Sequence, residues 1–429
     1  MIELEKINWG AELNTDLVNN AVQSALKTKK LFRYQYKETT SDVTHLEKEI
    51  TEYVNCKYAL AVSSATNGIF LALKACGVKH DDKVLIPAFT FVAVPSAVIQ
   101  AGGNPILVEC NDQYVISLSD LKNKIIKQRP RFLLLSHMRG HMPEMSKVVE
   151  LCKAFHVVLI EDAAHALGVK HNGKMAGTWG DIGIYSMQSY KMLNAGEGGI
   201  IVSNNEELMW QCIHMSGAYE NNYKLHMIEG RGGNKYRCQL PVFNCRLNNL
   251  SAAIARPQLQ RIENNIFQTN RNYMLFKEKM KEFKEITFPL SDQFLIDPTK
   301  VVLEQGQWEV EGVLAGYTAM NRPVRDSIQM QIDLDEACKK SLLYLCNSQN
   351  IPISWLGGTN NTNARLFWNW RFLPYTIRNE DICKYTKSIL DNLFDLRLPL
   401  HFTEKETQVV AEGFAAFMRR LTGKGVALK

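Results

Sequence analysis

One lysine stands where it could act as a nucleophile. Lys191 lies between an apolar run that predicts a strand at 183–187 and the glycines at 196, 198 and 199. Glycine permits positive φ angles and close backbone approach, so such a turn can hold a lysine away from water. A desolvated ε-amino group loses its proton more readily and can attack an aldehyde. A surface lysine before a hairpin would give the same local pattern.

The acid that closes the apolar run 157–162 is a second candidate. Asp162 ends the sequence VVLIED, and a carboxylate buried there needs a partner. A protonated pyridine nitrogen is such a partner, and the pair keeps the ring able to accept electrons. Asp162 could also cap a following helix, because aspartate is a common N-cap residue. The two roles can coexist.

Small and hydroxylated residues follow another predicted strand. The segment SSATNG at 63–68 includes Ala65 and Thr66 and lies between a strand and a helix. Hydroxyl groups at a helix N-terminus can bind an anion, so a phosphate group fits here, although an ordinary helix cap has the same composition. Phe91 follows the next strand, where its ring could lie against a planar ring or belong to the core.

The elements that position these residues alternate between short apolar runs and helical patterns. We predict strands at 58–64, 83–86, 105–109, 131–137, 157–162, 183–187 and 199–203, and helices at 67–76, 91–101, 118–126 and 147–155. Continuous apolar strands between amphipathic helices favour an α/β fold with a mainly parallel sheet covered on both faces. Ligands of such sheets bind at the carboxyl ends of the strands, where all the candidates above lie.

Chain length and the later pattern indicate two domains. The chain has 429 residues, which is too long for one ordinary domain. A helical pattern from Leu247 to about Phe283 is expected to lead into a second domain that ends in an amphipathic helix at 405–421. We therefore expect a large α/β domain with an N-terminal arm at 1–255 and a smaller α+β domain at 256–429. The polar stretch 217–243 is expected to be a functional or mobile loop.

Composition narrows the classes of protein. The net charge is +6, and the basic residues are spread along the chain, which is weak evidence for nucleic acid and fits an anionic substrate or cofactor at least as well. We expect no nucleic-acid partner. Ten cysteines form no C-x-x-C pair, and no histidines accompany them at zinc spacing, so we expect a reducing compartment and no metal site. We see neither a signal pattern nor an apolar window of membrane-spanning length, and therefore expect a cytoplasmic protein with no membrane partner.

Taken together, the motifs resemble those of a known family. The chain resembles the DegT/DnrJ/StrS-type sugar aminotransferases, pyridoxal-phosphate (PLP) enzymes of fold type I, over roughly residues 30–420. The matching motifs are EDAAHALG at 161–168, GDIGIYSMQSYKMLNAGEGG at 180–199, NCRLNNLSAAIARPQL at 244–259 and LPLHFTEKE at 398–406. The resemblance implies a mainly parallel seven-stranded sheet, a smaller C-terminal α+β domain, and a homodimer with active sites at the interface.

The resemblance also assigns roles to matched positions. It implies that Lys191 holds pyridoxal 5′-phosphate as an internal Schiff base and later shuttles the proton, and that Asp162 pairs with the pyridine nitrogen. The other implied cofactor contacts are Ser186, Ala65 and Thr66 at the phosphate, Phe91 on the ring, His165 near the ring hydroxyl, and Asn244 and Arg246 reaching the other subunit. Deoxysugar dehydratases of the same family carry histidine at this position, so Lys191 favours transamination over elimination of water.

The implied reaction moves an amino group from Glu or Gln to a keto-sugar or sugar acid, with pyridoxamine 5′-phosphate as an intermediate form and ping-pong kinetics. Such a reaction belongs to the biosynthesis of an amino sugar, polysaccharide or natural product. The acceptor stays open: it could be a nucleotide-linked sugar, an octulosonate or a cyclitol. A cofactor-binding sensor without turnover is also open. A nicotinamide oxidoreductase is disfavoured, since the first strand is followed by SSATNG and not by G-x-G-x-x-G.

Departures from the family pattern supply candidate substrate residues. Two segments differ, LFRYQ at 31–35 and SHMRGH at 136–141, and the long polar stretch adds one arginine. Arginines bind carboxylates or phosphates through paired contacts, although solvated surface arginines would look the same in sequence. The candidates are Arg33, Tyr34, His137, Arg139 and Arg231. The segment LGGTNNTNARLFWNW, up to Trp370, has no equivalent in the family pattern.

Overall fold

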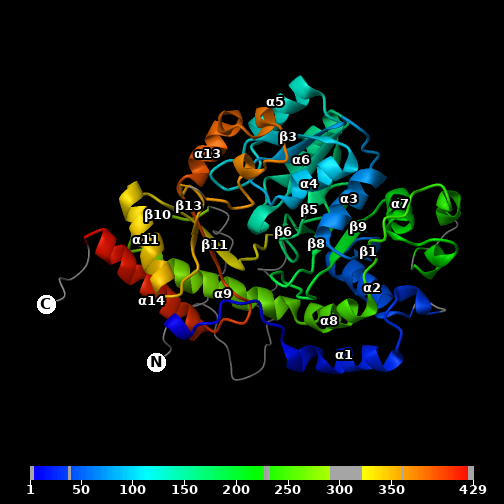
Figure 1. Cartoon of the computed structure of the whole chain (residues 1–429), viewed down its shortest axis with the longest axis horizontal. Coiled ribbons are helices and arrows are strands. Elements are labelled where there is room, and N and C mark those ends of the chain that lie inside the picture. The colour runs from blue at the N-terminus through cyan, green and yellow to red at the C-terminus, as the bar shows by residue number, and fades with distance from the viewer. Residues whose placement is uncertain are drawn as a thin grey trace.

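The protein is built on two separate sheets, one large and one small. The structure, a computed structural model, describes residues 4–36, 40–226, 228, 232–289, 321–359 and 361–423. A seven-stranded sheet is formed by the first half of the chain, and a four-stranded sheet by residues after 285. Figure 1 shows the large sheet among its helices in one half of the molecule and the small sheet in the other half.

The large sheet is mainly parallel, as predicted. Its strands, in spatial order, are β1 (Tyr58–Val62), β9 (Gly199–Ser203), β8 (Ile182–Ser186), β5 (Val158–Asp162), β4 (Phe132–Ser136), β2 (Lys83–Pro87) and β3 (Asn104–Val108). Every pair from β8 to β3 is parallel, whereas β9 runs antiparallel to both β1 and β8. The carboxyl ends of β5 and β8 therefore lie side by side, which brings Asp162 and Ser186 to one edge.

The strands are apolar because both faces of the sheet are covered. β4, β8 and β9 are buried along their whole length, as expected for a sheet between two helical layers. The helices predicted between the strands are present as α3 (Ala65–Ala75), α4 (Ala93–Ala101), α5 (Leu118–Gln128) and α6 (Met145–Ala154). A hairpin of two short strands, β6 (Lys170–His171) and β7 (Lys174–Met175), was not predicted from the sequence.

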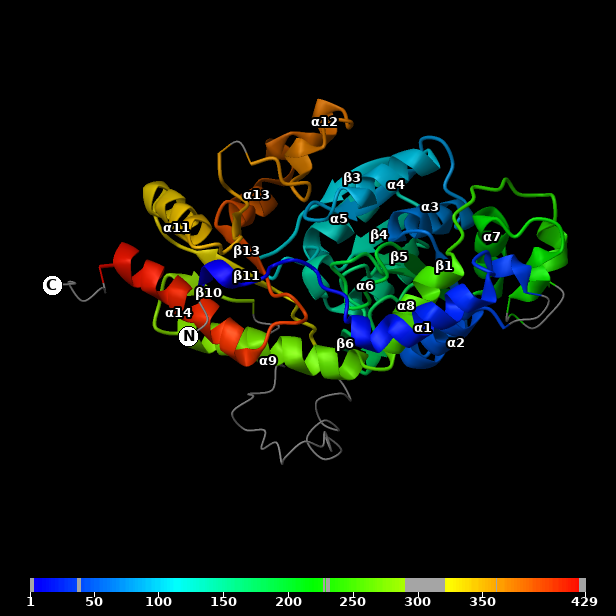
Figure 2. The same ribbon diagram turned by 60° about the horizontal axis from the view of Figure 1, so that its bottom comes forward.

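More helices pack around the large sheet. These are α1 (Thr15–Thr28), α2 (Asp42–Val54), α7 (Glu206–Ser216) and α8 (Asn249–Leu259). α1 and α2 both pack against α8, and Figure 2 shows α1 beside α8 and α2. Short helical turns complete this part as η2 (Arg33–Gln35), η3 (Met138–Gly140), η4 (Asn222–Leu225) and η5 (Gly232–Tyr236). A further turn, η1 (Leu4–Lys6), packs against the C-terminal helix α14 (Glu404–Leu421) in the other half of the molecule. Arg231 lies outside the described residues.

The prediction of one helical run from Leu247 to Phe283 was wrong in one respect. The run consists of α8 and α9 (Ile262–Met280), which are separated at Gln260 and Arg261. Pro257 lies inside α8, has no amide hydrogen and cannot complete the hydrogen bond to the preceding turn. The helix ends within one turn after this proline, and α9 then continues into the second half of the molecule.

The small sheet is antiparallel and carries its own core. Its strand order is β10 (Ile286–Thr287), β11 (Ser327–Ile332), β13 (Leu393–Arg397) and β12 (Ser354–Trp355). The remaining elements are α11 (Glu336–Ser348), η8 (Phe367–Asn369), α12 (Tyr375–Arg378), η9 (Glu380–Cys383), α13 (Lys384–Leu390) and α14 (Glu404–Leu421). α9 packs along α14, and the two helices lie together in Figures 1 and 2. A mixed α+β second half and the C-terminal helix are thus confirmed.

The end of the predicted large domain falls inside α8, because residues 255 and 256 are both helical. The division at this position stays a prediction. Over the ranges that the structure describes, no helix is long and apolar enough to cross a membrane. Within the same ranges, no three or more His, Cys, Asp or Glu side chains gather as a metal would require.

Candidate active site

A cavity of about 770 Å³ lies at the carboxyl ends of the central strands of the large sheet. Residues from both sheets line it. From the large-sheet part come Ser64, Ala65, Thr66, Phe91, Arg139, Asp162, His165, Ser186 and Lys191, and from the later part of the chain come Asn363, Arg365, Asp395 and Arg397. Most residues that the sequence proposed for a cofactor are therefore brought together in one place.

Lys191 presents its amine inside this cavity. Its Nζ atom lies 2.8 Å from Nε2 of His165, and both side chains are partly buried. Burial, together with Arg139 and Arg397, lowers the pKa of Lys191 to about 7, against the opposing effect of Asp326 and Asp162. Burial and the nearby lysine also lower the pKa of His165 well below its usual value. The pair thus combines a neutral imidazole with an amine that is largely unprotonated above pH 7.

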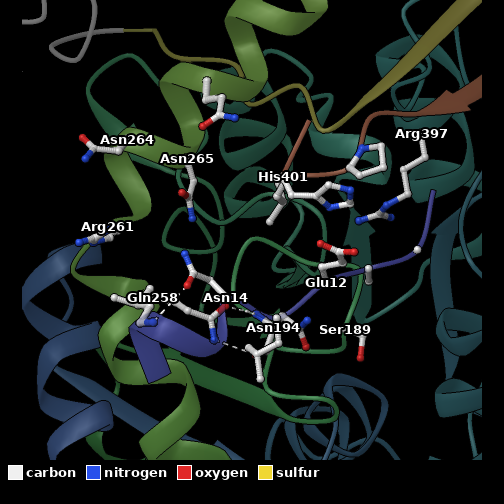
Figure 3. Close-up of a pocket in the computed structure, with 17 residues that line it drawn as sticks. Glu12, Asn14, Ser189, Asn194, Gln258, Arg261, Asn264, Asn265, Arg397 and His401 are labelled. Carbon is white, nitrogen blue, oxygen red and sulfur yellow. Dashed lines mark hydrogen bonds between the residues drawn. The ribbon is translucent and has the colours of Figure 1, made fainter. Parts of the chain in front are cut away.

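The loop that carries Lys191 is fixed by a glutamine of α8. Gln258 accepts the Asn194 amide hydrogen through Oε1 at 2.9 Å and donates from Nε2 to the Asn194 carbonyl at 2.8 Å. Figure 3 shows these side chains in a neighbouring cavity of about 490 Å³, which is also lined by Ser189 and Arg397. Arg397 donates to the carbonyl of Tyr190. The lysine loop is therefore held on both sides of Lys191.

Asp162 is buried at the end of β5, and its hydrogen bonds compensate only part of the cost of burying its charge. It accepts a hydrogen bond from Oγ of Ser136 at 2.7 Å and one from the amide of Ala164 at 3.1 Å. Burial raises the pKa of this carboxyl, although those hydrogen bonds and Lys191 act in the opposite direction. A buried carboxylate in this state is stabilised by a cation, so the site suits a protonated ring nitrogen. Asp162 can therefore accept the Ala164 amide hydrogen in the local turn and also pair with a ligand cation.

The N-terminus of α3 lines the cavity and can bind an anion. Ser64 caps the helix by accepting the amide hydrogen of Asn67, while Ala65 and Thr66 in the first turn line the cavity with Ser186 of β8. First-turn amides lack helical acceptors and attract anions. Gly199 makes this arrangement possible, since a Cβ atom there would lie 2.5 Å from the Ala65 amide nitrogen. β9 can therefore pass directly beside the start of the helix.

Phe91 and Arg139 also line the cavity, in different ways. The Phe91 side chain is 45% exposed, so its ring is free to contact a ligand. Arg139 is buried and donates to Oδ2 of Asp395 at 2.5 Å. Its backbone has a φ of 56°, a left-handed conformation that is uncommon for residues other than glycine.

Three proposed substrate residues lie outside the cavity, and each is bound within the fold. Arg33 forms a buried pair of hydrogen bonds with Glu47, at 2.8 and 3.0 Å. Tyr34 contacts His226 at 2.9 Å. His137 contacts Glu161 at 2.8 Å in the core. The positive charge of Arg33 is thus neutralised by a carboxylate of the same chain, a contact that sequence spacing does not reveal.

Asn244 and Arg246 are likewise absent from the cavity of their own chain. Asn244 is exposed, with a φ of 52°. The guanidinium of Arg246 lies 5.3 Å from the ring of Phe32 and 5.6 Å from the ring of Tyr219, and it donates to the Gly217 carbonyl at 3.1 Å. Asn244 therefore stands on the outer surface, and Arg246 is half-buried beside it.

Sequence reasoning missed several residues of the cavity. Arg365, Asp395 and Arg397 line it together with Arg139. Arg365 belongs to the segment for which the sequence offered no account; there Asn361 and Asn363 accept hydrogen bonds from nearby backbone amides, and Leu366 pairs with Phe89. Arg397 ends β13 directly before the LPLHFTEKE motif. An arginine at a strand end was the available signal, but nothing local linked it to the lysine.

Comparison with known proteins gives concordant results. The model of the DegT/DnrJ/EryC1/StrS aminotransferase family matches residues 15–305. GDP-perosamine synthase of Escherichia coli O157:H7 is 30% identical over 256 residues, 59% of this chain and 66% of the relative. GDP-perosamine synthase of Vibrio cholerae is 32% identical over 222 residues, 52% of this chain and 58% of the relative. The chain thus spans less than two thirds of the length of these relatives.

Solved structures share the fold at low sequence identity. An aminotransferase from Psychrobacter cryohalolentis has a TM-score of 0.80 and 17% identity, covering 96% of this chain and 100% of that one. A GDP-4-keto-6-deoxymannose-3-dehydratase, described with a trapped PLP-glutamate geminal diamine, has a TM-score of 0.72 and 18% identity, covering 95% and 100%. These similarities establish the fold class. The reaction has to be inferred from the residues of the site.

Proposed function

We propose, since the chain belongs to the DegT/DnrJ/EryC1/StrS aminotransferase family, that it is a PLP-dependent aminotransferase. It would move an amino group from glutamate or glutamine to a keto-sugar or sugar acid. The observation that carries this proposal is the amine of Lys191, with a pKa of about 7, in the same cavity as Asp162 and the start of α3. Relatives named GDP-perosamine synthase support a nucleotide-linked keto-sugar as the acceptor.

The residues of the cavity fit this cofactor. Asp162 is a buried carboxylate whose raised pKa shows the need for a cation, as a protonated ring nitrogen would provide. Ala65 and Thr66, at the helix N-terminus, together with Ser186, would hold the phosphate. Phe91 has an exposed ring that can stack on a planar ligand. Each chemical feature of the cofactor thus has a matching group on the chain.

The side chains then have defined tasks. The bound cofactor supplies an electrophilic carbon and an electron-accepting ring. Lys191 Nζ takes a proton from the substrate carbon and returns a proton on the other side of the transfer, which its pKa of about 7 permits near neutral pH. His165, through Nε2, orients this amine. Asp162 maintains a negative charge at the ring nitrogen and so favours loss of the substrate proton.

We propose in addition that the chain works as a homodimer. Large apolar side chains are exposed around Arg246, including Phe32 and Tyr219, which it contacts, and Val242 and Phe243, which precede it. Exposed apolar patches commonly mark protein interfaces. Asn244 lies in the same surface and does not reach its own cavity. A second copy that covers this patch would receive Asn244 and Arg246 beside its cofactor phosphate.

The cofactor test comes first. The purified protein, incubated with PLP and desalted, is expected to absorb visible light, and borohydride reduction followed by peptide mapping is expected to find the cofactor on Lys191. Addition of glutamate should then shift the spectrum before any acceptor is present. A protein that takes up no PLP, or carries it on another lysine, contradicts the proposal. Uptake without a spectral change for any donor would favour a cofactor-binding sensor.

The dimer is tested by mixing two inactive variants. Lys191→Ala and Asn244→Ala protomers are unfolded, mixed and refolded together. If each active site uses Asn244 from the partner, mixed dimers contain one site with both native residues and recover activity. Each variant refolded alone is the control and should stay inactive. Mixtures without recovery would argue that Asn244 serves its own chain or no active site.

We also propose a cytoplasmic location. All ten cysteines are free, and burial raises the thiol pKa of Cys110, Cys346 and Cys152 to about 12. Free thiols in this number fit a reducing compartment. Fractionation of cells that express the tagged protein tests the location, and recovery with a secreted or membrane fraction would contradict it.

A further inference from the structure

Three arginines line the active-site cavity beside Lys191, although they come from distant parts of the chain. Arg139 follows β4, Arg365 belongs to the segment after β12, and Arg397 ends β13. None is a freely solvated surface residue: Arg139 is 4% exposed, and the side chains of Arg365 and Arg397 are 19% and 20% exposed. Their convergence in a partly buried space requires compensation by anions.

The protein supplies two carboxylates to these three guanidinium groups. Asp395 accepts from Arg139 at 2.5 Å and from Arg365 at 2.9 Å. Its other oxygen accepts from the amide of Gln329 at 2.7 Å. The second carboxylate, Asp326, lies 3.8 Å from Arg397. The five charged groups therefore leave an excess of one positive charge at the wall of the cavity.

Hydrogen bonding in this cluster is also incomplete. Within the described part of the chain, the buried Nε atoms of Arg139 and Arg365 have no hydrogen-bond partner. Each of these guanidinium groups makes one hydrogen bond, to the shared Asp395. Buried donors without acceptors are costly and uncommon. In addition, burial and neighbouring arginines lower the pKa of Arg365 and Arg397, an effect that a bound anion would reverse.

Arg397 differs from the other two arginines in its contacts. It donates to the carbonyl of Tyr190, directly before Lys191, and its guanidinium lies 4.7 Å from the Tyr190 ring. It is thus attached to the lysine loop. Arg139 and Arg365 instead converge on Asp395 and contain the unsatisfied nitrogens. Arg139 and Arg365 therefore form the part of the cluster that can bind an anionic group of a substrate.

We infer that Arg365 and Arg139 bind a compact oxyanion, a carboxylate or a phosphate monoester, on the amino-group acceptor. The inference rests on the proposed aminotransferase function, and it favours acidic or phosphorylated keto-sugars over nucleotide-linked ones among the acceptors of that reaction. Arginine is suited to this task because its planar fork matches both oxyanions and stays charged when partly buried. Arg365 is then the residue that determines acceptor specificity, while Lys191 and the cofactor perform the chemistry.

Kinetics with matched acceptors test the inference. The acceptors are a keto-hexuronate, its uncharged amide, a keto-hexose 6-phosphate and a GDP-linked keto-hexose. For Arg365→Gln we expect the KM of the anionic acceptor to rise roughly 10- to 100-fold, as loss of a charged hydrogen bond predicts. The value for the uncharged amide and the rate of the glutamate half-reaction should stay the same. Whichever of carboxylate and phosphate shows the larger rise identifies the natural oxyanion.

Two further variants make the result interpretable. Arg365→Lys retains the charge and should recover part of the affinity, and its melting temperature shows whether the fold is intact. Arg371→Gln removes an exposed arginine of the same segment that does not line the cavity, and it should change nothing. An equal loss for charged and uncharged acceptors, a loss confined to the glutamate half-reaction, or the same loss in Arg371→Gln overturns the inference.

A binding measurement separates this inference from the proposed function. Calorimetric titration of the cofactor-loaded protein with glucuronate, glucuronamide and glucose 6-phosphate involves no turnover. We expect one of the two anions to bind, the amide not to bind, and Arg365→Gln to lose the anion. If all three probes behave alike while glutamate still shifts the cofactor spectrum, the oxyanion site is wrong and the aminotransferase assignment stands. If PLP is not bound at all, the assignment itself fails.

Discussion

The two sides of the active-site cavity are built in different ways. On the side of the large sheet, Asp162, Ser186 and Thr66 stand at strand ends or in the first turn of a helix, positions that a parallel sheet brings together by its topology. On the side of the small sheet, Arg365 and Arg397 approach Arg139 only through tertiary packing. The first side carries a carboxylate, hydroxyl groups and a helix N-terminus, and the second side carries a cluster of arginines.

The difference suggests a division between chemistry and selection. Changes on the large-sheet side should abolish cofactor binding or turnover for every substrate, whereas changes on the small-sheet side should distinguish one acceptor from another. Buried ion pairs that lie outside the cavity, such as that of Arg33 with Glu47, should affect stability alone. Variants at the three kinds of position should separate these outcomes, with the largest effect on the reaction at Lys191.

Lys191→Ala should have the largest effect. Removing the amine removes both the attachment point of PLP and the proton carrier, so we expect turnover to fall by at least about 10³-fold. The variant should lack the covalent adduct after borohydride reduction while its melting temperature stays close to that of the unaltered protein. Substantial turnover by the variant would show that another group carries the proton.

The free amine of Lys191 should depend on pH near neutrality. Its pKa is lowered to about 7 from the ordinary 10.5, so the amine is protonated below pH 7 and free above it. At pH 7 about 10³ times more free amine is present than on an ordinary lysine. Labelling of the cofactor-free protein with an acylating reagent, followed by mass spectrometry, should therefore reach a plateau soon after pH 7. Labelling of Lys191 that still rises steeply above pH 9 would contradict the lowered pKa.

Asp162→Asn should keep the fold but lose most of the rate. The amide preserves the shape and can still accept from Ser136, yet it carries no charge to support a protonated ring nitrogen. We expect turnover to fall about 10²- to 10³-fold, similar to the loss of one electrostatic stabilising group. Ser136→Ala is the matched control, because it removes the hydrogen bond and leaves the charge. Equal losses in both variants would mean that geometry, and not charge, is what Asp162 provides.

Gln258→Leu should disturb the position of Lys191 without touching the substrate. The change leaves the buried backbone amide and carbonyl of Asn194 unpaired, at a cost of about 1–3 kcal/mol in unfolding free energy. We expect a roughly 10-fold lower kcat, because small misplacements of reacting groups are costly, and an unchanged acceptor KM. Asn264→Ala, in the same neighbouring cavity, is the control. A raised KM with a normal kcat would place Gln258 in substrate binding instead.

Arg33→Ala should have the smallest effect on the reaction. The variant leaves Glu47 buried without its partner, which commonly costs about 3–5 kcal/mol of unfolding free energy. Denaturant unfolding should show this loss, while the folded protein keeps its KM for both substrates. An increase in acceptor KM with normal stability would restore Arg33 as a substrate residue.

The positions of the strands could be predicted because each is a short apolar run that ends in small or polar residues. β4 and β5, for example, lie within one residue of the predicted ranges. The split between α8 and α9 was missed, since the apolar pattern continues through Pro257 and only the backbone shows where the hydrogen bonding stops. Arg33 and His137 could not be assigned, because Glu47 and Glu161, which bind them, are identified only by the folded structure.

The sequence by itself determined the order of strands and helices and placed the lysine, the acid and the hydroxyl groups at the same sheet edge, because these depend on local hydrophobic pattern and on the rule that parallel strands end together. Only the tertiary structure decided which arginines face the cavity. Arg139, Arg365 and Arg397 are more than 30 residues apart, and no periodicity links them. Their carboxylate partners are Asp395 of β13 and Asp326, directly before β11. Charge pairing between distant segments is a property of packing, which local patterns in the sequence do not reveal.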